Sequence, residues 1–88
     1  MKILSKFVTT NTQIHNGKCY FIGMLVENGK ELSAYNIESG GSQGVGNRVG
    51  WLHENGINSM MLPKPGVECS NGLYIENSDN YCQVYYAI

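Results

Sequence analysis

Hydrophobic and polar residues alternate with a period of two over much of the chain, which is typical of β-strands. The alternation is clearest at residues 81–87, where odd and even positions would lie on opposite faces. Residues 2–10 alternate more weakly and predict an edge strand, because Lys2 and Lys6 would discourage pairing with other chains. Helix-forming residues are scarce, so the pattern favours an all-β fold.

Residues 18–38 are expected to form a central β-hairpin. Strand-favouring residues fill positions 19–26, and Asn28-Gly29 supplies the two positive φ angles of a type I′ turn. Such a turn would place Leu25 opposite Leu32. Both faces of the first strand are apolar, with odd positions on one face and even positions on the other. It should therefore be central in a two-layer structure or covered on its outer face by a neighbouring subunit.

The remaining segments predict further short strands separated by turns. Residues 11–16 are polar and turn-like, and the five glycines of residues 39–50 indicate a surface loop. A second hairpin is expected around Asn55-Gly56, from strands at 49–53 and 57–62, and Pro63 to Gly66 should end it. Strands at 72–76 and 81–87 finish the chain. We therefore predict a single β domain over 1–88, a small antiparallel sandwich or barrel of about six to eight short strands.

Charge and length narrow the class of partner. Six Lys or Arg and seven Asp or Glu are spread without runs, for a formal net charge of -1. This balance argues against nucleic acid or an anionic membrane as the main partner, because binding phosphate needs a cationic stripe. The first apolar run is too short for a signal sequence, which places the chain in a cytoplasm. A chain of 88 residues buries only about two-thirds of its unfolded surface, so docking on a partner or on a second copy would stabilise it.

The side chains that carry out chemistry form no recognisable pattern. Cys19, Cys69 and Cys82 show no CxxC spacing and fit small buried hydrophobes in a reducing compartment, with a Cys69–Cys82 bridge only if the last two strands pair. His15 and His53 have no sequence relation to a cysteine that would indicate nucleophilic catalysis. The 39–50 loop has no GK[ST] motif and the wrong spacing for a dinucleotide fingerprint. We therefore expect no enzyme activity, metal or cofactor.

Large amphipathic side chains are the remaining candidates for function. Trp51, with Met60 and Met61 beside it in the second hairpin, would form part of an interface, since rigid rings contribute much contact area at little entropic cost. Tyr85 and Tyr86 fit two interpretations equally, an interface or the lining of a sandwich with the hydroxyls in water.

Two segments together resemble a known class of protein. The first is HNGKCYFIGMLVENGKELSAYNIESGG, and the second is LPKPGVECSNGLYIENSDNYCQVYY, with its NGLY strand and VYY ending. They are similar to small β-structured virion proteins of tailed bacteriophages. The resemblance implies a capsid auxiliary, decoration or head-associated subunit, assembled in the bacterial cytoplasm, that binds the major capsid protein or other virion subunits and has no catalytic residue. Cys69, Cys82 and the long glycine-rich loop depart from the pattern of such proteins.

A rival interpretation is a small phage-encoded binding module or inhibitor, acting in host takeover or against host defence. Its basis is the 39–50 loop, which could wrap a partner, with Arg48 as the only arginine and the natural anion contact.

Overall fold

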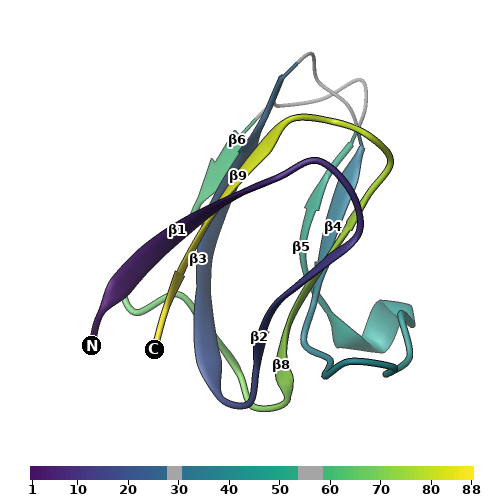
Figure 1. Cartoon of the computed structure of the whole chain (residues 1–88). Coiled ribbons are helices and arrows are strands. Elements are labelled where there is room, and N and C mark those ends of the chain that lie inside the picture. The colour runs from purple at the N-terminus through teal and green to yellow at the C-terminus, as the bar shows by residue number, and fades with distance from the viewer. Residues whose placement is uncertain (28–30, 54–58) are drawn as a thin grey trace.

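The computed structural model describes residues 1–27, 31–53 and 59–88, and in these ranges it shows nine strands in two antiparallel sheets that face each other (Figure 1). The predicted all-β sandwich is therefore confirmed. Sheet A has the order β1-β9-β3-β6, with β7 also paired to β3, and sheet B has the order β2-β8-β4-β5. The strands are β1 (Ile3–Val8), β2 (Thr12–Asn16), β3 (Cys19–Val26), β4 (Leu32–Tyr35), β5 (Arg48–Leu52), β6 (Ser59–Met61), β7 (Val67–Cys69), β8 (Gly72–Asn77) and β9 (Cys82–Ala87), and a short 3-10 helix, η2 (Val45–Asn47), precedes β5.

Strand β3 is the centre of sheet A, as its two apolar faces predicted. It pairs with β9 along one edge, and with β6 and then β7 along the other. Strand β1 lies at the end of the sheet beside β9, which confirms the predicted edge strand. The sheet places the backbone of residue 2 beside that of residue 88, where two N–H···O bonds of 3.0 Å join Lys2 and Ile88.

The predicted hairpin over residues 18–38 was wrong. Its first strand, β3, belongs to sheet A, whereas its second, β4, belongs to sheet B and pairs with β8 and β5. Val26 and Leu32, on either side of the connection, are both buried. The connection therefore passes from one layer to the other, and each strand finds its partners far away in sequence. The Asn28-Gly29 turn itself lies outside the described residues.

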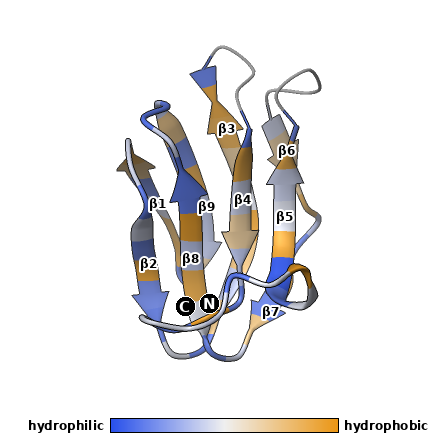
Figure 2. Ribbon diagram, turned by 90° about the vertical axis from the view of Figure 1, so that its right-hand side faces the viewer, coloured by the Kyte–Doolittle hydropathy of each residue, from blue (hydrophilic) through white to orange (hydrophobic). Residues whose placement is uncertain are grey.

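The second predicted hairpin, from strands at 49–53 and 57–62, fails for the same reason. Strand β5 is in sheet B and β6 in sheet A, so they form no hairpin, and the Asn55-Gly56 turn lies outside the described residues. The last two strands are likewise split between the sheets, so no Cys69–Cys82 bridge forms. Cys69 instead lies opposite Cys19, and all three thiols are free. Residues 12–16, expected as a turn, form β2 at the edge of sheet B. Its neighbour β8 shows alternating hydrophobic and hydrophilic bands (Figure 2).

A bulge in β3 changes which side chains reach the core. The ladder between β3 and β9 shifts between Phe21 and Gly23, so the alternation of the strand reverses at Ile22. A regular period of two would group Phe21 with Gly23 and Leu25, but Phe21 is buried on the inner side while Leu25 is exposed. The segment between β6 and β7 lies beside this bulge, since the N–H of Leu62 donates a hydrogen bond of 2.8 Å to the carbonyl of Ile22.

The core contains residues from both sheets: Val8, Ile14, Cys19, Phe21, Met24, Val26, Leu32, Ala34, Leu52, Cys69, Leu73, Ile75, Cys82 and Val84.

Candidate functional site

The outer face of sheet A is unusually apolar for a surface open to water. The strand registers place outward-facing residues of five strands in three rows: Phe7, Gln83, Leu25 and Ser59; Ser5, Tyr85, Gly23 and Met61; Ile3, Ala87, Tyr20 and Glu68. Ile3, Phe7, Leu25 and Met61 are all exposed large hydrophobic residues. We call the set Ile3, Phe7, Tyr20, Leu25, Met61 and Tyr85 the apolar face.

The apolar face is extended at one end by an aromatic pair and bounded at the other by charge. The ring centroids of Phe7 and Tyr81 are 5.8 Å apart, and Tyr81 is itself exposed. At the opposite end, Lys18 lies 3.8 Å from Glu68, and its Nζ is 5.9 Å from the ring of Tyr20. Exposed ion pairs contribute little to stability. Between these ends no row includes a charged residue.

The bulge in β3 explains why the apolar face exists. Because the strand reverses its alternation at Ile22, Leu25 lies on the same side as Tyr20, and Gly23 lies between them. A Cβ at Gly23 would approach the Met61 sulfur, so the absence of a side chain allows Met61 to lie across the strand. The local backbone therefore brings large hydrophobic residues of β3 and β6 to one surface.

The six predicted interface residues separate into three groups. Met61 and Tyr85 belong to the apolar face, whereas Met60 and Tyr86 pack against the core and are only partly buried. Trp51 and Arg48 lie on the other side of the molecule, in β5 of sheet B, with the guanidinium of Arg48 4.4 Å from the centroid of the Trp51 ring. Strands β5 and β6 form no hairpin, so the predicted pairing that placed Met60 and Met61 beside Trp51 does not form.

Sequence reasoning missed Ile3, Phe7 and Leu25. Phe7 and Ile3 share one side of the alternating 2–10 segment, which was a usable signal. The exposure of Leu25 had no such signal, because a regular strand would have grouped it with the buried Phe21.

The pKa values of the three buried cysteines shift in different directions: the hydrogen bond with Cys69 lowers that of Cys19, whereas those of Cys69 and Cys82 are raised. Burial raises the pKa of Cys82 to about 11. A hydrogen bond with the Cys19 thiol, followed by burial, raises the pKa of Cys69. Among residues 1–27, 31–53 and 59–88, no group of three His, Cys, Asp or Glu side chains is placed to hold a metal ion. Within the same ranges no helix has the length and apolar character needed to cross a bilayer.

No protein-family model, curated protein or solved structure matches the chain.

Proposed function

We propose that the chain is a structural subunit of a tailed-bacteriophage particle, and that it docks on the protein shell through the apolar face. The observation that supports this function is the apolar face itself, which crosses four strands and whose rows contain no charged residue apart from Glu68. Large exposed apolar patches on small proteins mark surfaces that bind another protein.

The composition of the apolar face fits a protein partner. Tyr20 and Tyr85 lie between aliphatic side chains, and tyrosine and methionine are enriched at the centres of protein interfaces while charges are depleted there. A specific interface buries about 800 Å² on each partner, so docking would cover much of one sheet of so small a protein. The near-zero net charge also allows many copies to pack side by side without strong mutual repulsion.

Mass spectrometry of purified phage particles tests the virion role directly. We expect peptides of this chain in particles banded on a density gradient and treated with a protease that removes loosely associated protein. Absence of the chain from such particles would refute the proposal.

A binding assay tests the role of the apolar face. Particles lacking the chain should bind the purified wild-type protein, and Leu25→Lys should weaken this binding at least about tenfold, because a lysine would be buried without a partner in the interface. The matched control is Val45→Lys, which adds the same charge at an exposed position of η2, outside the apolar face. Equal binding by Leu25→Lys and wild type would exclude this face as the docking surface.

A further inference from the structure

The outer face of sheet B has a different chemistry from that of sheet A. The registers align Tyr74, Tyr35 and Arg48 in one row across the sheet, and Glu76, Ser33 and Trp51 in the next. Glu31 precedes Ser33 by two residues and Ser78 follows Glu76 by two, so both continue the same face beyond the second row. This face combines aromatic rings with carboxylates and hydroxyls, which is a composition for binding a small polar ligand.

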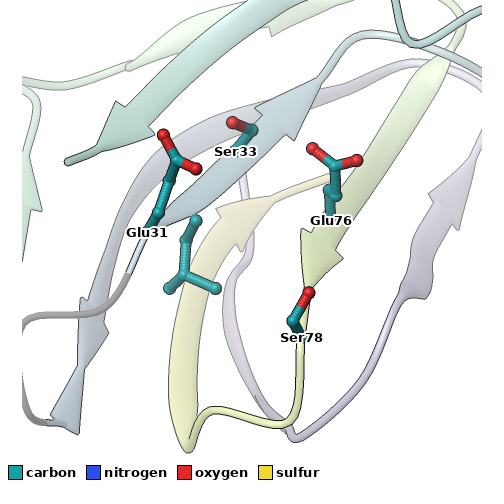
Figure 3. A pocket seen from close by; sticks show the side chains of 5 residues that line it. Glu31, Ser33, Glu76 and Ser78 are labelled. Atoms are coloured by element: carbon teal, nitrogen blue, oxygen red, sulfur yellow. The ribbon is translucent and has the colours of Figure 1, made fainter. Parts of the chain in front are cut away.

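Four of these residues surround a hollow. Glu31, Ser33, Glu76 and Ser78 line a space of about 190 Å³, together with Leu32 (Figure 3). We call the four polar residues the acidic cell. Glu31, just before β4, and Glu76 in β8 occupy diagonal positions, and diagonal neighbours across two strands lie about 7–8 Å apart. This separation leaves room for a ligand between the two carboxylates.

Aromatic side chains hold both carboxylates in place. The Trp51 Nε1–H donates a hydrogen bond of 3.0 Å to Glu31 Oε2, and the Tyr35 hydroxyl donates one of 3.3 Å to Glu76 Oε1. Each carboxylate has about four acceptor positions, so both keep capacity for further donors. Within the described part of the chain, neither forms an ion pair. The acidic cell is therefore preorganised, with both carboxylates open to a ligand.

Ser33 gives independent evidence for a ligand. The residue is only 5% exposed, and its side chain lines the hollow between the two carboxylates (Figure 3). Its hydroxyl has no hydrogen-bond partner among the residues that the structure describes. Because this hydroxyl opens to the hollow, it can exchange hydrogen bonds with a polar group that enters it.

We propose that the acidic cell binds one saccharide unit, with an amino sugar preferred. Sugar hydroxyls would donate to Glu31 and Glu76 and exchange hydrogen bonds with Ser33, while the apolar C–H face of the ring would contact the partly exposed Trp51. A protonated amino group adds attraction to the two carboxylates, whereas a sugar carboxylate would be repelled. Ca²⁺ fits less well, because it needs six to eight oxygen ligands and leaves the aromatic rings unused.

This site does not depend on the proposed virion role. The acidic cell and the apolar face lie on opposite outer surfaces of the sandwich, so a subunit docked through sheet A would still expose the acidic cell. Failure of particle binding would leave sugar binding intact, and the reverse also holds.

Titration of the ¹⁵N-labelled full chain with glucosamine, glucose and glucuronic acid tests the proposal. The only tryptophan is Trp51, so its indole N–H resonance and its fluorescence report directly on the rim of the acidic cell. We expect millimolar binding that shifts the resonances of Ser33, Glu76 and the Trp51 indole, in the order glucosamine, then glucose, with glucuronic acid weakest.

Variants locate the binding. Glu76→Gln and Ser33→Ala should each reduce glucosamine affinity about tenfold, because each removes hydrogen bonds to the ligand. Glu68→Gln is the matched control, since it neutralises an exposed carboxylate on sheet A, and it should bind like the wild type. The amide spectrum of each variant verifies its fold, and if Ser33→Ala does not fold, Glu76→Gln decides.

Three results would overturn the proposal. The first is that none of the sugars shifts these resonances. The second is that Ca²⁺ or N-α-acetyl-lysine shifts them while glucose does not, which would make the acidic cell a cation site only. The third is that Glu68→Gln weakens glucosamine binding as much as Glu76→Gln.

Discussion

The side chain of Asn77 connects three parts of the molecule. It is buried, and its Nδ2 donates to the carbonyls of Asn80, at 2.7 Å, and Val8, at 3.4 Å, while its Oδ1 accepts from the N–H of Asn80 at 3.0 Å. Its backbone N–H donates to Asn11 Oδ1 at 2.7 Å. Asn77 therefore fastens the end of β8 to the turn before β9 and to the link between β1 and β2.

We expect Asn77→Leu to destabilise the fold by about 2–3 kcal/mol, because it leaves the buried groups of Val8 and Asn80 without partners. Urea unfolding followed by circular dichroism measures this difference. Asn47→Leu is a useful control, since Asn47 Nδ2 also donates to a backbone carbonyl, that of Ser42, but at an exposed site. An equal loss in both variants would contradict the role assigned to burial.

The raised pKa of Cys82 predicts a dependence of stability on pH. The pKa of a thiol is about 8.5 in the unfolded chain and about 11 for Cys82 in the folded protein. Between these values the unfolded state has lost a proton that the folded state keeps, so the free energy of unfolding should fall by up to about 1.4 kcal/mol per pH unit as the pH rises. Below the lower value this contribution is fully present.

Urea titrations from pH 8 to 11 should show a steeper loss of stability for the wild type than for Cys82→Ala. The variant is less stable at every pH because of the cavity, so the slope is the quantity to compare. Equal slopes would show that Cys82 does not keep its proton in the folded protein.

At the scale of elements, the break between β6 and β7 depends on Gly66. Its φ is +84°, and a Cβ there would lie 2.3 Å from the carbonyl oxygen of Phe21 in β3. Gly66→Ala should therefore cost about 2 kcal/mol or more, since both the backbone conformation and the packing of β7 on β3 oppose it. Gly46→Ala in η2 is the matched control, because a Cβ there meets no atom within 4 Å.

Thermal unfolding of the two variants measures this difference directly. A melting temperature for Gly66→Ala equal to that of Gly46→Ala would mean that the backbone around Gly66 relaxes without loss.

The sequence was sufficient to predict which segments form strands, but not which strands pair with each other. Alternation identified β1 and β9, and the doubly apolar pattern identified β3 as central, because these signals depend on burial alone. Asn28-Gly29 is a local turn signal, and it does not encode whether the next strand continues in the same sheet or crosses to the opposite one. Val26 and Leu32 are both buried in the core, and their hydrophobic character would be the same whether their strands belonged to one sheet or to two.

The candidate sites were hidden for a related reason. Glu31 and Glu76 become neighbours only through the register between β4 and β8, and neither has a sequence feature that relates it to the other. The exposure of Leu25 depends on the bulge at Ile22, for which the adjacent Gly23 is only a weak indication, since glycine within a strand often accompanies a bulge.

At the scale of the whole molecule, the apolar face predicts that the isolated chain oligomerises or is loosely folded. A second copy that covers this face would remove Phe7, Leu25 and Met61 from water, at about 25 cal/mol for each Å² of apolar surface buried. Sedimentation velocity at micromolar concentration should therefore show species larger than a monomer, or amide exchange should be fast throughout. Leu25→Lys should shift an oligomer toward monomer, and Val45→Lys should not. A well-folded, monodisperse wild-type monomer would contradict this expectation.

The pairing of β3 with β9 also determines the order in which the fold can form. Its principal ladder joins Tyr20–Val26 to residues 82–87, so the segments that become β4 to β8 must be synthesised before the centre of sheet A is complete. Closing such long loops is entropically costly, and proteins dominated by distant contacts fold in milliseconds to seconds rather than microseconds. During that interval the apolar segment that becomes β3 is exposed without its partner β9. Chaperones that bind extended hydrophobic segments would recognise it.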